Sequence, residues 1–241
     1  MEIDSITQIQ AEWRVAAAAG GSTASSHAAL AFAGVVEAVS KLQQNLRTLS
    51  YPAVPGLIAV GSGLEARIGR LATAAQGTVP PLLRAFWSSV GGISLVDLND
   101  YAHIEFWGSH GIRGPQGFCD GVYVDACSHS WLDFAVEDLV DQAQDPDADL
   151  FVIPISPDGY HKDDISGGPA YGLAVDGDWL TPLQHFDWTG PLRPRSAPDE
   201  PCDLLSYLRS SILECAGFPA LYGVEAFEPI RRRLLENVRV F

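Results

Sequence analysis

Residues 151–176 read FVIPISPDGYHKDDISGGPAYGLAVD, which is a polar, glycine-rich stretch between two apolar segments. The segments FVIPIS and YGLAVD are short apolar runs of the kind found in buried strands. Pro157-Asp158-Gly159 has the composition of a turn, because proline presets φ and glycine accepts a left-handed backbone. Gly167-Gly168-Pro169 adds a second bend. We therefore predict a strand, a polar loop and a second strand.

The surrounding sequence extends this pattern to an α+β fold. Further extended segments are predicted at 93–98, 101–108, 121–127 and 178–186, where apolar and polar residues alternate between glycine-rich turns. Apolar residues at helical spacing predict helices at 5–19, 27–48, 64–75, 79–90, 131–144 and 200–217. The expected architecture is a mostly antiparallel or mixed sheet packed with helices and preceded by an N-terminal helical extension.

Helix ends and segment boundaries follow from local composition. The stretch GGSTASS at 20–26 is predicted to be a flexible connector whose last serine caps the next helix. Ser62 and Asp203 are expected near two further helix starts, and Gly217 just past the last helix end. Within 131–144, Leu132, Ala135, Leu139 and Val140 are expected to face inward.

Three segments are expected along the chain: a helical extension at 1–50, the α+β domain at 51–220 and a basic tail at 221–241. The tail contains Arg231-Arg232-Arg233 and is expected to be a solvated terminus.

The protein is strongly acidic, with 241 residues, a formal net charge of −15 and a pI near 4.6. Such a charge repels nucleic-acid phosphates and anionic membranes, so neither is an expected partner. No secretory leader or membrane span is found in the sequence. The four cysteines lack paired C-x-x-C spacing, which is typical of reduced structural thiols. We therefore expect a cytoplasmic protein.

Few residues have the spacing of a catalytic or metal site. Asp158, His161, Asp163 and Asp164 fall in one polar loop, where they are either solvated turn residues or a metal-assisted hydrolase site. Asp145, Asp147 and Asp149 alternate as in a calcium loop, but that loop needs glycine and glutamate where Leu150 and Ser156 stand. No cofactor, metal or enzymatic activity is expected, and the turn interpretation is favoured.

Carboxylates are concentrated in the second half of the chain. From Asp120 to Asp187 there are fifteen acidic residues and one basic residue, Lys162. This segment is either a solvated face or a surface that binds a basic protein, and such a surface would raise the association rate by about 10–10³. The candidate partner-binding residues are Asp133, Glu137, Asp138, Asp141, Asp145, Asp147, Asp149, Asp158, Asp163 and Asp164.

Three segments of the chain resemble the SUKH superfamily. VPPLLRAFWSSVGGISL at 79–95 is similar to the opening helix and Gly-bearing turn of those domains. Residues 151–176 resemble its later strand–acidic turn–strand unit, lengthened here by GGP, and DLLSYLRSSILE resembles its last helix. The resemblance covers residues 60–218.

The resemblance implies a non-enzymatic α+β binding domain. Bacterial members act as immunity proteins against toxins, often nucleases, and fungal members regulate cell-wall assembly through protein contacts. We therefore expect a module that neutralises a cationic toxin by stoichiometric binding. The first alternative function is a regulatory scaffold of the same fold with another partner. The second alternative is a hydrolase with its site in the loop at 158–164.

Overall fold

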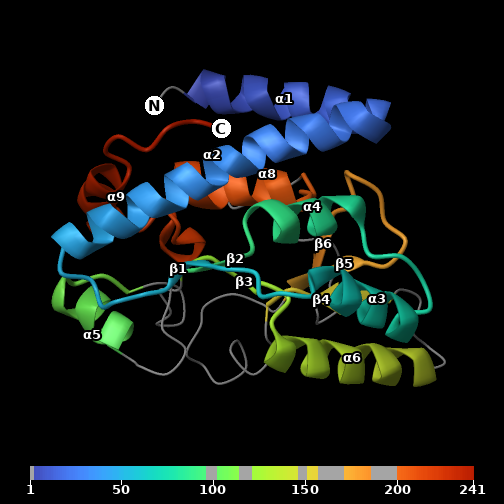
Figure 1. Cartoon of the computed structure of the whole chain (residues 1–241). Coiled ribbons are helices and arrows are strands. Elements are labelled where there is room, and N and C mark those ends of the chain that lie inside the picture. The colour runs from blue at the N-terminus through green and yellow to red at the C-terminus, as the bar shows by residue number, and fades with distance from the viewer. Residues whose placement is uncertain (1–2, 96–101, 114–120, 146–150, 157–170, 186–199) are drawn as a thin grey trace.

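Helices from the two ends of the chain lie together on one side of two small antiparallel sheets in a computed structural model, and helices from the middle of the chain lie on the other side (Figure 1). The structure describes residues 3–95, 102–113, 121–145, 151–156, 171–185 and 200–241. The predicted α+β class with an N-terminal helical region is confirmed.

The elements alternate irregularly along the chain, as expected for this fold class. The helices are α1 (Ile3–Ala19), α2 (Gly21–Thr48), α3 (Leu64–Ala74), α4 (Pro81–Ser89), α5 (Ala102–Ser109), α6 (His129–Gln144), α8 (Leu204–Arg209), the π-helical turn η2 (Ser210–Glu214), the 3₁₀ turns η3 (Pro219–Leu221) and η4 (Glu225–Phe227), and α9 (Glu228–Leu234). The strands are β1 (Gly56–Ile58), β2 (Gly92–Ser94), β3 (Tyr123–Val124), β4 (Val152–Pro154), β5 (Tyr171–Ala174) and β6 (Leu183–His185).

The strands form two antiparallel sheets with orders β1-β2-β3 and β4-β5-β6. Ile93 lies opposite Val124 in the first sheet, and Ile153 lies opposite Leu173 in the second. The two sheets meet where the amide of Asp125 donates to the carbonyl of Ile155 at 2.9 Å. The hydroxyl of Tyr171 also donates to the carbonyl of Tyr123 across this junction. The apolar segments at 151–156 and 171–176 are thus adjacent strands, as their sequence predicts.

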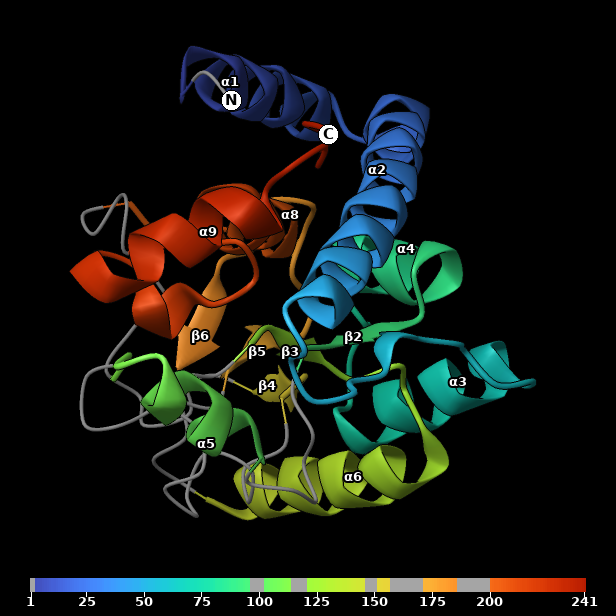
Figure 2. The same ribbon diagram turned by 90° about the vertical axis from the view of Figure 1, so that its left-hand side faces the viewer.

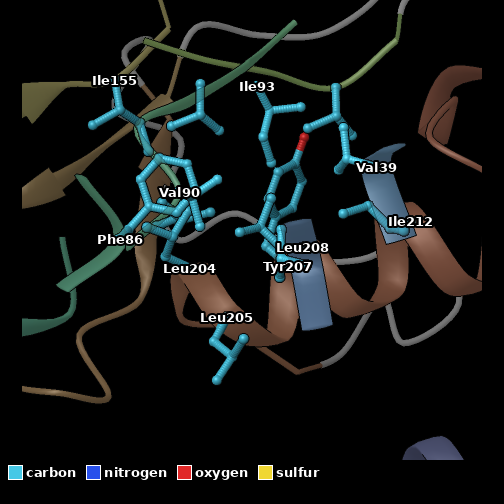
Figure 3. Packing of buried hydrophobic residues seen from close by; sticks show 14 of the residues in the cluster. Val39, Phe86, Val90, Ile93, Ile155, Leu204, Leu205, Tyr207, Leu208 and Ile212 are labelled. Carbon is cyan, nitrogen blue, oxygen red and sulfur yellow. The ribbon is translucent and has the colours of Figure 1, made fainter. Parts of the chain in front are cut away.

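The core lies between the sheets and helices α2, α4 and α8. Val39 of α2, Phe86 of α4 and Ile93 of β2 converge with Leu208 of α8 in this region (Figure 3). Burial of such side chains is the main favourable contribution to folding, worth about 1.5–3 kcal/mol for each large apolar residue. Asp203 accepts hydrogen bonds from the amides of Leu205 and Ser206, so the predicted cap of this helix is confirmed.

The N-terminal helices begin differently from the prediction. GGSTASS is not a flexible connector, because α2 already begins at Gly21, and Gly20 rather than Ser26 precedes it. Glycine and serine are weak helix formers, but Ala24 and Ala28 are fully buried in this first part of α2. Tertiary packing therefore outweighs local propensity here. Ser62 is also not the cap of α3; Gly63, at φ 79°, occupies that position.

Residues 101–108 were predicted to be extended, and this prediction is wrong, because Ala102–Ser109 form helix α5. Trp107 of this helix is fully buried and its ring lies 4.9 Å from that of Phe218 and 5.5 Å from that of Phe227. The helix brings this large side chain into contact with residues more than a hundred positions later. Such distant partners are not visible in the local alternation of YAHIEFWG.

The basic C-terminal segment is also not a solvated terminus. Leu234 is fully buried, and the side-chain amide of Asn45 on α2 donates to its carbonyl at 2.7 Å. Gly34 of α2 leaves room for Phe241, since any side chain at Gly34 would overlap it. Residues from segments 1–50, 51–220 and 221–241 therefore share one hydrophobic core.

Candidate partner-binding face on helix α6

Helix α6 is anchored at its N-terminus by two polar side chains. The hydroxyl of Ser128 accepts from the amide of Trp131 at 3.3 Å and caps the helix. The carboxylate of Asp125 accepts from the amide of Ser128 at 2.8 Å and from the hydroxyl of Tyr123 at 3.1 Å. Asp125 is buried, and this burial raises the pKa of its carboxyl group. The start of α6 is thereby fixed to the junction between the two sheets.

The apolar side of α6 packs inward as expected, with one exception. Leu132, Ala135 and Leu139 are buried as predicted, and Trp131 is buried with them. Val140 was predicted to face inward but is 42% exposed. The inward position one turn beyond Leu139 is occupied instead by Gln142, a polar residue.

Gln142 attaches the end of α6 to the edge of strand β4. Its side-chain carbonyl accepts from the amide of Val152 at 2.8 Å, and its side-chain amide donates to the carbonyl of Val152 at 3.0 Å. The same amide donates to Asp138 at 2.6 Å. The sequence pattern did not predict this role of Gln142. Its position continues the buried stripe of Ala135 and Leu139, and this spacing could have indicated that its side chain faces inward.

Four of the ten predicted partner-binding residues lie along the outer side of α6. Asp133, Glu137, Asp141 and Asp145 are exposed, and their spacing of four residues aligns them on one side of the helix. We call these four residues together with Val140 the α6 acidic face. Asp138 is half-buried and turned toward Gln142, so it is placed apart from this face.

The other five predicted residues cannot be placed on this face. Asp147, Asp149, Asp158, Asp163 and Asp164 lie outside the described residues, as does His161 of the alternative hydrolase site. The description of the partner-binding surface therefore rests on α6 and its immediate neighbours.

Little positive charge opposes the α6 acidic face. Helix α6 contains no lysine or arginine. Arg70 of the neighbouring helix α3 forms an ion pair of 2.8 Å with Asp133, in which both side chains are more than half exposed. Exposed pairs of this kind contribute about 0–1 kcal/mol. Within the described ranges, Glu137 and Asp141 form no ion pair with a basic side chain.

The described cysteines have the environment of structural thiols. Cys127, Cys202 and Cys215 are buried and form no disulfide bond with one another. Burial raises the pKa of Cys127 to about 11 and that of Cys202 to about 12, so both stay protonated at neutral pH. A thiolate nucleophile is therefore not formed at these two positions.

A hollow of about 1220 Å³ lies between α1, α8 and the C-terminal turns, away from the α6 acidic face. Its charged residues interact with each other, since Arg14 pairs with Glu200 at 2.9 Å and Arg231 with Glu228 at 2.7 Å. The pKa of Glu228 falls to about 2, chiefly because of its hydrogen bonds to Arg231. This hollow thus offers few uncommitted charges to a ligand.

The described ranges contain neither a metal-binding cluster nor a membrane-spanning helix. No group of three or more His, Cys, Asp or Glu side chains there is arranged to hold a metal ion. None of the helices in this part of the chain combines the length and the apolar character that a membrane crossing requires.

Comparison with known proteins adds no family assignment. No protein-family model, curated protein or solved structure matches the chain.

Proposed function

We propose that the protein is a non-enzymatic binding module that neutralises a cationic protein by stoichiometric contact with the α6 acidic face. The observation that supports this most strongly is the position of the acids on the helix. Asp141 lies in the last turn and Asp145 is the C-cap, with no basic residue in that turn. Negative charge at this end opposes the helix dipole, typically by about 0.3–1 kcal/mol per residue.

The carboxylate of Asp141 opposes the dipole of α6 in the free protein, and a bound cation would relieve this repulsion. A lysine or arginine of the partner would neutralise the carboxylates and interact favourably with the helix C-terminus. The net charge of −15 would also accelerate the encounter with a basic protein. Binding thus removes the unfavourable interaction between the carboxylates and the helix dipole, and this gain contributes to the affinity of the complex.

Val140 adds an apolar contact to the charged surface. It is 42% exposed and lies one turn after Glu137 on the same helix. Specific interfaces combine an apolar centre with a polar rim. On α6, Val140 is a small apolar centre and Glu137 and Asp141 are its polar rim. This arrangement favours a protein partner over a small cation.

The resemblance to the SUKH superfamily suggests which partner this is. We infer an immunity protein acting in the cytoplasm against a toxin, in particular a nuclease. Nucleases bind phosphate groups with cationic surfaces, and a row of carboxylates can occupy the same surface. The toxin surface must then be rich in arginine or lysine, because unpaired buried carboxylates would oppose binding.

The test is affinity capture from a lysate of the source organism at low salt. The unaltered protein should retain a basic protein that the double variant Glu137→Lys/Asp141→Lys does not retain. With the purified partner, we expect the variant to associate at least about tenfold more slowly. One equivalent of the unaltered protein should abolish the partner's nuclease activity, and high salt should weaken the complex.

Glu37→Lys/Glu225→Lys is the matched control, because both residues are exposed and lie outside α6. It changes the net charge by the same amount and should retain most of the binding. Equal loss in both double variants would mean that only the overall charge matters. Unchanged binding in the α6 variant would contradict the proposed face, and a captured protein without toxin activity would contradict the immunity function.

A further inference from the structure

We propose that the outer side of the α1–α2 pair is the contact surface between two copies of this chain. This proposal is independent of the partner bound at α6. Leu30 and Val15, which are 76% and 73% exposed, are the most exposed large apolar side chains among the described residues.

These two residues lie on one continuous surface formed by two adjacent helices. Gly20 and Gly21, with φ of 67° and 52°, reverse the chain between α1 and α2. Trp13 of α1 then lies against His27 of α2, with ring centroids 5.7 Å apart. The two helices are therefore in contact near their connection, and Figure 2 shows them diverging at a steep angle from there.

The inward sides of both helices are already occupied. Trp13, Ala16 and Ala17 of α1 are buried, as are Ala28 and Ala31 of α2. Val15 and Leu30 are about 200° from Trp13 and Ala28 around their helices, at about 100° per residue, and therefore face away from the core. The exposed residues that surround them are mostly small and apolar: Ala11, Ala18, Ala19, Ala29 and Ala33.

The distribution of charge indicates that the occupant is a second copy. Residues 3–48 contain three acids (Asp4, Glu12, Glu37) and three bases (Arg14, Lys41, Arg47), so this part has no net charge in a chain of −15. Two copies repel each other over most of their surface, and contact through this neutral part keeps the acidic regions far apart. A strongly basic partner would find no net negative charge here.

The available area fits a weak dimer. Helix α1 has 17 residues, so it is about 25 Å long, and two helices each about 10 Å wide offer roughly 500 Å² per copy. A contact of this size is at the low end of specific interfaces, so we expect a dissociation constant in the micromolar range. A symmetric contact of the same surface on both copies closes after two chains.

Such a dimer leaves the α6 acidic face free. In both views α6 lies at the opposite end of the molecule from α1 and the beginning of α2 (Figures 1 and 2). The two acidic faces would then point away from the shared surface. Dimerisation and partner binding therefore do not compete.

The test is the mass of the full chain in solution, measured by sedimentation velocity from nanomolar to high micromolar concentration. We expect a reversible change from one to two copies of the 25.9 kDa chain. Leu30→Glu should weaken the dimer by at least about 100-fold, because the two-fold symmetry introduces the charge twice. Val15→Glu should act in the same direction.

Val140→Glu is the control, since Val140 is also an exposed helical valine but lies on α6. Far-UV circular dichroism and the melting temperature should be unchanged in all three variants because the replaced side chains are exposed. Added sodium chloride should strengthen the dimer by screening the repulsion between copies. A monomer at every concentration would overturn the proposal, and so would a dimer that is unaffected by both Leu30→Glu and Val15→Glu.

Discussion

Two buried residues, the N-cap Asp203 and the last residue Arg209 of α8, attach both ends of the described chain to the core. The carboxylate of Asp203 accepts from the indole nitrogen of Trp13 at 3.1 Å and from the hydroxyl of Ser206 at 2.7 Å. Arg209 is 1% exposed and donates to the carbonyls of Phe241 at 2.8 Å and Ile9 at 3.4 Å. Burial lowers the pKa of Arg209 to about 10, which still leaves it charged at neutral pH.

We expect Asp203→Ala to be among the most destabilising single changes in the protein. It removes the cap of α8 and leaves the buried indole N–H of Trp13 without an acceptor. Together these losses should lower the free energy of unfolding by about 2–4 kcal/mol in urea denaturation. Asp203→Asn keeps one acceptor oxygen and should lose clearly less. Equal losses in the two variants would contradict this role of the carboxylate oxygens.

The same residue makes stability depend on pH. Burial raises the pKa of the Asp203 carboxyl group above its unfolded value, so the folded state binds the proton more tightly. The stabilisation that this proton gives is complete at pH values below the unfolded pKa of about 3.9 and is lost as the pH rises through the folded pKa. Compared with Asp203→Asn, the unaltered protein should therefore lose unfolding free energy on going from about pH 4 toward neutral. Parallel pH profiles for the two proteins would contradict the raised pKa.

At the level of single elements, α6 combines low helix stability with the proposed binding function. Asp141→Lys places a positive charge in the last turn, so it should raise the free energy of unfolding by about 0.3–1 kcal/mol while it weakens partner binding. Asp133 lies in the first turns of α6, and Asp133→Lys removes its ion pair with Arg70. This variant should therefore not raise the free energy of unfolding. Urea denaturation of both variants measures the difference. A destabilised Asp141→Lys protein would contradict the unfavourable dipole interaction.

Elements with a clear internal pattern could be predicted from the sequence. Helix α4 and its buried Leu82, Leu83, Phe86 and Trp87 follow from their spacing alone. The prediction failed where distant contacts decide the structure, as in α5 around Trp107 and at the start of α2. For the candidate site, the spacing of Asp133, Glu137 and Asp141 was visible, but the exposure of Val140 and the inward turn of Asp138 depend on Gln142 reaching β4.

At the scale of the whole molecule, all three predicted segments contribute described residues to the same hydrophobic core. Trp13 of the first segment, Leu208 of the second and Leu234 of the third are all fully buried members of it. We therefore expect a single cooperative unfolding transition. Tryptophan fluorescence and far-UV circular dichroism should give the same midpoint in urea. An earlier transition with loss of helical signal alone would show that the N-terminal helices unfold separately.

The pairing of Gln142 with Val152 has a consequence for the solubility of the protein. Strand β4 is an edge strand of its sheet, so its outward backbone amides and carbonyls could bind a strand of another molecule. The Gln142 side chain occupies the outward amide and carbonyl of Val152, and Pro154 has no amide hydrogen to offer. Gln142→Ala should therefore promote fibre formation on prolonged incubation, measured by thioflavin fluorescence, whereas Gln144→Ala at the exposed neighbouring position should not. The side chain of a helix residue thus takes the hydrogen-bonding positions that a further strand would take, and we expect it to oppose edge-to-edge assembly in concentrated solution.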